Sequence, residues 1–148
     1  MLTSKDLMIG DWVEYRFTGW TEKGGVYKDY QYVQISTIGD LYVKADNDRV
    51  ASADGEEFYP IPLTAEILEK NGFEKSNQIS DTPPYYMDED GNIYYSLEQN
   101  GVNLFWGWWQ PDNVYLIPAN GMGWINIKYV HELQHAIRLC GIEKEIEL

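Results

Sequence analysis

The first sixty residues alternate between apolar and polar side chains in short runs separated by turns. Two such runs, DWVEYRF at 11–17 and YQYVQIST at 30–37, place every second side chain on one face, as a strand with one buried face requires. DLYVKAD at 40–46 and ADGEEFYPI at 53–61 follow after turns rich in Gly, Asp and Asn. Four or five strands at this spacing predict a small half-open barrel, SH3-like in size, over residues 1–60.

Residues 61–72, IPLTAEILEKNG, carry the signals of a short helix from about residue 65 to residue 71. Thr64 is a good N-cap, and Glu66 lies in the first turn, where the helix dipole favours an anion. Gly72 fits the left-handed position that ends many helices. The prolines of YPIPLT mark the best boundary between an N-terminal and a C-terminal part.

The next segment, 73–128, returns to strand-like runs. PYYM and IYYSLE flank DEDGN, which predicts a hairpin, and VNLFWGWW, NVYLIP and GWINI follow after short turns. The acids of DEDGN are assigned to a hairpin tip and not to a calcium loop, because Tyr86 and Leu97 stand where an EF-hand has acids. These runs predict an antiparallel sheet of four or five strands.

A second helix is expected from about 127 to 140, capped by Asn126 and stopped by Gly141. Its apolar stripe, which should pack on the sheet, consists of Val130, Leu133, Ile137 and Cys140. The tail GIEKEIEL alternates again, so it is either a final edge strand or a frayed acidic end. The fold class is therefore α+β, with subdomains 1–60 and 61–148 or one continuous domain.

Several motifs carry a family resemblance: IGDWV near the start, PIPLT and NGF around the first helix, and YVHxLQ in the second. In this order they resemble a family of small acidic proteins from Bacteroides-type gut bacteria and their phages and mobile elements. The resemblance covers most of the chain, most loosely between residues 76 and 124. That family has no established activity, so the resemblance implies no catalytic residue. It implies that Glu132 and His135 are variable positions.

The second helix also spells H-E-x-x-H, the zinc-peptidase signature, with the only two histidines of the chain. On a helix His131 and His135 project from one side, where both could reach one zinc ion. Glu132 would then activate a zinc-bound water as the catalytic base. This defines the enzymatic alternative, a zinc metallopeptidase-like hydrolase.

Three observations oppose a zinc site. At about 100° per residue, both histidines point roughly opposite to the apolar stripe, so we expect their rings to lie in solvent. No third histidine exists, and a catalytic zinc needs three protein ligands. Arg138 lies two turns after His131 and disfavours a dication. The preferred interpretation is therefore a non-enzymatic protein without cofactor.

The amino-acid composition narrows the range of possible binding partners. The chain has 148 residues and a net charge of −13, with acids spread along its length, which disfavours nucleic acid and anionic membranes. A DNA mimic would explain the charge only if the acids lined one face. The single cysteine, Cys140, allows no internal disulfide. No signal-like or membrane-spanning run is recognisable, so we expect a cytoplasmic protein.

Aromatic residues make up 15% of the chain, and VNLFWGWW concentrates them. In a strand, Trp106 and Trp108 share one face while Trp109 points the other way. If one face is open to solvent, its tryptophans form a binding site for protein or carbohydrate, so Trp106, Trp108 and Trp109 are the candidate residues. The competing interpretation is that both faces are covered. The sequence thus favours a protein-interaction module, with zinc hydrolase and carbohydrate binder as alternatives.

Overall fold

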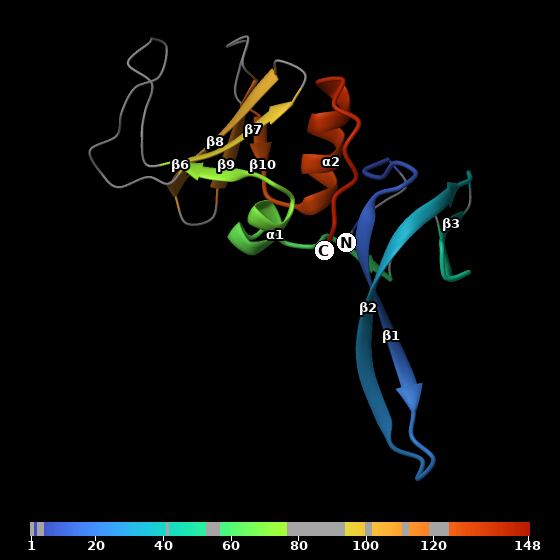
Figure 1. The fold of residues 1–148 in the computed structure, drawn as a ribbon. Coiled ribbons are helices and arrows are strands. Elements are labelled where there is room, and N and C mark those ends of the chain that lie inside the picture. Colours follow the sequence, from blue (N-terminus) through green and yellow to red (C-terminus); the bar gives the residue numbers. More distant parts are fainter. Residues whose placement is uncertain are drawn as a thin grey trace. The chain divides into compact units, whose positions relative to one another are not determined.

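The computed structural model describes residues 2, 5–40, 42–52, 57–76, 94–99, 102–110, 113–118 and 125–148. It has two compact units, described separately below. One contains Met1–Pro62 and Tyr129–His131, and the other contains Leu63–Lys128 and Glu132–Leu148. Each unit holds an antiparallel sheet, and two helices complete an α+β protein (Figure 1).

The first unit is built on a five-stranded sheet of the order β4-β3-β2-β1-β5. Its strands are β1 (Trp12–Trp20), β2 (Val26–Ile38), β3 (Tyr42–Ala45), β4 (Val50–Ser52) and β5 (Phe58–Tyr59). All of these pairings are antiparallel, and the register of β2 against β3 shifts between Ile35 and Thr37. Among the described residues the order ends at β4 and at β5, so the sheet is open.

Burial in this unit follows the alternation of the sequence. Val13 and Tyr15 share one side of their alternating run, as do Val33 and Ile35 of theirs, and all four are buried. They share a core with Leu2, Leu7, Val43, Ala45 and Phe58. The predicted strand bounds are wrong at the hairpin, because β1 continues to Trp20 and β2 already begins at Val26. Cross-strand pairing holds an unbroken register from Trp12↔Gln34 to Trp20↔Val26, so backbone bonding extends the strands beyond the buried core.

Asp11 organises the turn that enters β1. It is fully buried, and its Oδ2 accepts the backbone N–H of Met8 at 2.7 Å. Its backbone oxygen accepts the N–H of Ile35 at 2.9 Å. Gly10, at φ 88°, supplies the left-handed conformation that this turn requires, and its N–H donates to the oxygen of Ile35 at 2.6 Å.

The second unit holds a five-stranded antiparallel meander of the order β10-β9-β8-β7-β6, as the sequence predicted. Its strands are β6 (Glu74–Ser76), β7 (Tyr94–Gln99), β8 (Val102–Gln110), β9 (Asn113–Pro118) and β10 (Ile125–Ile127). The predicted hairpin tip at 88–92 lies outside the described residues. Over Tyr94–Ser96, β7 pairs with β6 on one edge and with β8 on the other, and β6 was not among the predicted strands. The predicted strand PYYM lies outside the described residues.

The first helix forms where its local signals predicted it. Helix α1 spans Ala65–Lys70, and Oγ1 of Thr64 accepts the N–H of Ile67 at 3.3 Å as an N-cap does. Gly72 has φ 75° and ends the helix. Leu68 is the residue of α1 that is fully buried, so it anchors the helix to the core.

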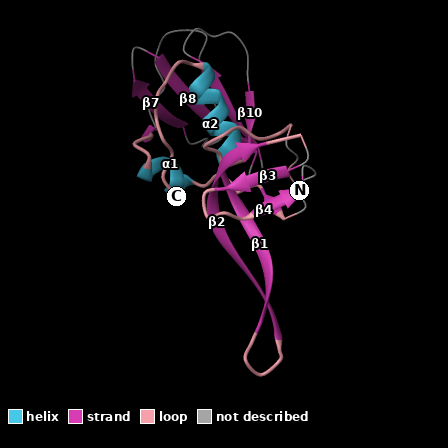
Figure 2. Ribbon diagram, turned by 90° about the vertical axis from the view of Figure 1, so that its right-hand side faces the viewer, coloured by secondary structure: helices cyan, strands magenta, loops and turns pink. Residues whose placement is uncertain are grey.

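Helix α2 spans Val130–Leu139 and lies along one face of the second sheet (Figures 1 and 2). It begins three residues later than expected, so Asn126, which belongs to β10, is not its cap. The helix ends as predicted at Gly141, with φ 74°, and the N–H of Ile142 donates to the oxygen of Ile137 at 3.0 Å. Neither helix of the described chain has the length and apolar run that crossing a bilayer requires.

The predicted edge strand at 142–148 is wrong, because this tail adopts no strand conformation. A frayed end is equally wrong. Ile142 and Ile146 are buried, with exposed fractions of 1% and 2%. The alternation in GIEKEIEL therefore reflects an extended tail that packs its isoleucines without joining a sheet.

Candidate functional site

The H-E-x-x-H residues do not lie as the sequence predicted. His131 is only 4% exposed, and its ring stacks on that of Tyr129 with centroids 5.8 Å apart and planes at 10°. His135 is half-buried. The expectation that both imidazoles lie in solvent is therefore wrong for His131.

The error arises because α2 buries a wider arc than its aliphatic stripe. Val130, Leu133 and Ile137 are buried as predicted, whereas Cys140, just beyond the helix, is half-buried. Gln134 and Ala136, each 3% exposed, widen the buried surface on both flanks. A polar Gln in the buried arc gives no hydrophobic signal, so periodicity alone underestimated the arc.

Glu132 is engaged at the start of the helix. Its Oε2 accepts the backbone N–H of Lys128 at 2.7 Å, closing the N-terminal turn much as the acid of a capping box does. The Glu132 carboxylate therefore has a structural role that does not depend on a zinc ion. In the described part of the chain, no group of three His, Cys, Asp or Glu residues is placed to hold a metal ion.

The tryptophans proposed as a binding surface lie on the central strand of the second sheet. Trp106 is opposite Tyr95 of β7 and Leu116 of β9, and Trp108 is opposite Val114. Trp109 sits where the register shifts before Gln110. The side chains of these tryptophans are outside the described part, so their exposure stays a prediction.

A different aromatic surface lies on the β1–β2 hairpin. β5 pairs with β1 at Glu14 and Tyr15, and β3 pairs with β2 over Ile35–Ile38. Of the described strands, β1 and β2 alone therefore make up the segment from Arg16 to Tyr32, which we call the ribbon. It projects beyond the other strands of its own sheet (Figures 1 and 2).

The end of the ribbon is well ordered by its own contacts. Thr21 donates its N–H to the oxygen of Gly25 at 2.7 Å, and its Oγ1 accepts the N–H of Gly25 at 2.9 Å. Gly24, at φ 78°, completes the turn. The ring of Tyr27 covers Gly19 on the opposite strand, close enough that a Cβ there would meet the ring at 2.3 Å. These contacts fix the turn and the cross-strand pair next to it without any partner.

One face of the ribbon gathers exposed aromatic and apolar side chains. The register pairs Trp20 with Val26 and Arg16 with Tyr30, and Tyr32 follows on the same face of β2. The exposed fractions are 74% for Trp20, 57% for Val26, 56% for Tyr30 and 46% for Tyr32. The rings of Tyr30 and Tyr32 lie 5.7 Å apart. We call Arg16, Trp20, Val26, Lys28, Tyr30 and Tyr32 the ribbon face.

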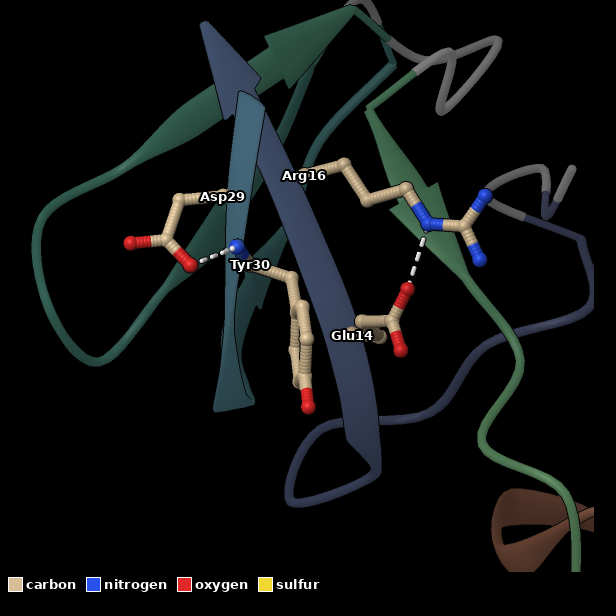
Figure 3. Close-up of polar contacts among 4 residues, drawn as sticks. All are labelled: Glu14, Arg16, Asp29 and Tyr30. Carbon is tan, nitrogen blue, oxygen red and sulfur yellow. Dashed lines mark hydrogen bonds and ion pairs between the residues drawn. The ribbon is translucent and has the colours of Figure 1, made fainter. Parts of the chain in front are cut away.

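Arg16 fixes the base of this face. Its guanidinium carbon lies 3.9 Å from the centre of the Tyr59 ring, and its Nε pairs with the carboxylate of Glu14 (Figure 3). The Arg16 side chain remains 57% exposed, whereas that of Glu14 is 14% exposed. Glu14 therefore balances the charge of Arg16, but the exposed guanidinium can still donate hydrogen bonds to a partner.

The edges of the ribbon are partly blocked against strand addition. Oδ1 of Asp29 accepts the N–H of Tyr30 at 2.9 Å (Figure 3). The N–H of Arg16 donates to the oxygen of Glu57 at 3.0 Å. Because both amides already have acceptors within the chain, an incoming strand would have to displace them. The face is consequently a better docking surface than either edge.

Sequence reasoning missed the ribbon face because it ended the strands at Phe17 and began them again at Tyr30. The available signal was the alternation that continues through Thr18 and Trp20 and resumes at Val26, on both sides of a Gly-Gly turn. No protein-family model, no curated protein and no solved structure matches the chain. Its function therefore has to be inferred from this geometry.

Proposed function

We propose that this chain is a non-enzymatic protein-interaction module and that the ribbon face is its docking surface. The observation that carries the proposal is the row of exposed Trp20, Val26, Tyr30 and Tyr32 on a preformed hairpin. Contiguous exposed aromatic surface costs solubility, and it marks binding sites in soluble proteins. Tyr and Trp also supply large contact areas with few rotatable bonds, which is why they dominate binding hot spots.

The topology of the first unit supports an SH3-like assignment for residues 1–60. Its last strand, β5, lies next to its first, β1, and the long β2 pairs with β1 at one end and with β3 at the other. This is the strand order expected of a small five-stranded barrel. The described sheet is open, so the barrel itself stays a prediction, as do the cytoplasmic location and the phage or mobile-element origin.

The zinc hydrolase is the weaker candidate. His131 is buried against Tyr129, and Glu132 accepts a backbone hydrogen bond at the helix start, so both side chains have structural roles. The carbohydrate alternative was predicted from Trp106, Trp108 and Trp109, and no described contact favours it.

Site-specific photocrosslinking tests the docking surface. A benzophenone amino acid is placed at Tyr30 of the ribbon face or, as the matched control, at Tyr42 of β3, which is 44% exposed. We expect one discrete protein adduct from Tyr30 and none from Tyr42. The Kd of that protein, once purified, should rise at least about tenfold on Trp20→Ser. Identical adducts from both positions, or an unchanged Kd, would refute the proposal.

A further inference from the structure

The ribbon differs in charge from the rest of the chain. It contains the cations Arg16, Lys23 and Lys28 and the acids Glu22 and Asp29, so its formal charge is +1 while the whole chain carries −13. All other residues together therefore carry −14. The ribbon thus carries no net negative charge, although the protein as a whole is acidic.

The charged residues on the two strands of the ribbon are also sorted between its faces, while Glu22 and Lys23 lie in the turn between β1 and β2. Arg16 and Lys28 stand on the ribbon face, beside Tyr30, whereas Asp29 belongs to the opposite face. The carboxylate of Asp29 additionally accepts the N–H of Tyr30. The one acid on the ribbon-face side of β1, Glu14, is largely covered and paired with Arg16. A partner on this face thus meets aromatic rings beside the exposed guanidinium of Arg16 and the exposed ammonium of Lys28, and Glu14 balances one of these two charges.

The size of the face restricts what can bind. From Val26 to Tyr32 the strand rises about 20 Å, and two strands with their side chains span roughly 10 Å, giving a patch of about 200 Å². An α-helix with its side chains is about 10–12 Å wide, and a strand is about 5 Å from its neighbour. A single extended or helical segment of a partner therefore matches the footprint of the ribbon face.

We propose that the ribbon face takes an acidic, aromatic-bearing segment of a partner protein; this inference rests on the proposed function and adds the chemistry of the partner. Carboxylates of the segment would pair with Arg16 and Lys28, and its rings would pack on Trp20 and Tyr30. Charge acts here over about one Debye length, about 8 Å at physiological salt, so the local cations govern the contact.

A single-stranded nucleic acid is the competing ligand, since it too combines negative charge with planar rings. It fits less well. A nucleic acid strand carries one phosphate per nucleotide and would extend past two exposed cations into the field of a chain of net charge −13. A short protein segment can place a few carboxylates at the cations and end there.

The probe is a fluorescent random copolymer of Glu and Tyr, measured by anisotropy at physiological ionic strength against poly-Glu and a poly-dT oligonucleotide. Net repulsion makes this a stringent probe, because general electrostatics opposes its binding. We expect binding of the Glu–Tyr copolymer and none of poly-Glu. Lys23→Glu with Lys28→Glu should weaken binding at least about tenfold, as should Trp20→Ser with Tyr30→Ser.

The matched control is Lys5→Glu with Lys128→Glu, which changes net charge equally at two exposed lysines outside the ribbon. It should leave the affinity unchanged, and circular dichroism should show that every variant is folded. Absent copolymer binding, equal weakening by the control, or tighter binding of poly-dT would overturn the inference. If crosslinking at Tyr30 succeeds while the copolymer does not bind, only the acidic partner is wrong. If both fail, the docking surface is wrong.

Discussion

The side chain of Asn71 pairs with the backbone of Glu147 as one peptide group pairs with another. Its Oδ1 accepts the N–H of Glu147 at 2.9 Å, and its Nδ2 donates to the oxygen of Glu147 at 2.7 Å. The same Nδ2 donates to the oxygen of Ile67 in α1, also at 2.7 Å. Lys70 adds a bond from its Nζ to the oxygen of Leu148. The side-chain amide of Asn71, at the end of α1, thus gives the C-terminal tail the pair of backbone hydrogen bonds that a neighbouring strand would otherwise supply.

Replacing Asn71 should therefore destabilise the second unit. Asn71 is 3% exposed, and Asn71→Ala leaves the backbone groups of Ile67 and Glu147 without the hydrogen bonds of its side chain. We expect the free energy of unfolding to fall by about 2–3 kcal/mol, measured by urea denaturation. Asn71→Asp should cost more at neutral pH, since a carboxylate cannot donate to the two carbonyl oxygens. That extra cost should shrink on acidification, when the carboxyl regains a donor.

The control for this prediction is Asn47→Ala. Asn47 also accepts a backbone N–H, that of Arg49 at 3.1 Å, but it is exposed, so water replaces the lost bond. Its cost should stay below about 1 kcal/mol. Equal losses at both positions would show that burial of the Asn71 pair is irrelevant to stability.

Position 141, two residues after α2 ends, should tolerate only side chains that accept a left-handed backbone. Gly141 has φ 74°, and a Cβ added there would meet no atom within 4 Å, so a substitution changes backbone strain without a clash. We expect Gly141→Ala to cost about 1–2 kcal/mol and Gly141→Asn less, because Asn adopts this conformation more easily. Leu139→Ala, at a side chain 79% exposed, should change stability by less than about 0.5 kcal/mol. Thermal unfolding checks the ranking, which fails if Asn is no better than Ala.

These elements show what local sequence can and cannot predict. The position of α1 was predictable because Thr64 and Gly72 each act on neighbours within a few residues. The docking of the tail was not, because Asn71 and Glu147 are 76 residues apart and an Asn before a Gly signals only a helix end. His131 was misplaced for the same reason, since burial of a polar side chain depends on distant packing.

Substitutions of Glu132 distinguish a structural role of its carboxylate from a catalytic one. Glu132→Ala removes the acceptor for Lys128 and should lower the free energy of unfolding by about 1 kcal/mol, while Glu132→Gln keeps an oxygen and should lose less. Urea denaturation measures both. Metal analysis of protein purified without a histidine tag provides the control. One zinc per chain, lost on His131→Ala, would contradict the structural role.

Glu66 should contribute a pH-dependent term to stability. Hydrogen bonds from its own backbone N–H and from the Thr64 side chain lower the pKa of its carboxyl below the ordinary 4.5. A lowered folded pKa means that the stabilisation is present above 4.5 and is lost as the pH falls through the folded value. Wild type should thus exceed Glu66→Gln in stability at neutral pH and match it in strong acid, measured by urea denaturation. An advantage of the wild type over Glu66→Gln that is the same at neutral pH and in strong acid would contradict this prediction.

Mutations in the ribbon face and mutations in the core should differ clearly in their effect on the free energy of unfolding if the exposed aromatic side chains serve binding. Trp20→Ser and Tyr30→Ser remove side chains that are 74% and 56% exposed, so each should change the free energy of unfolding by less than about 0.5 kcal/mol. Phe58→Ala, at a fully buried ring of the same unit, should cost about 3–5 kcal/mol. Thermal and urea denaturation measure all three variants. A loss at Trp20 or Tyr30 comparable to that at Phe58 would mean that these rings stabilise the fold. Because folding gains almost nothing from rings that stay in water, their concentration on one face of a preformed hairpin is better explained by a partner that covers them.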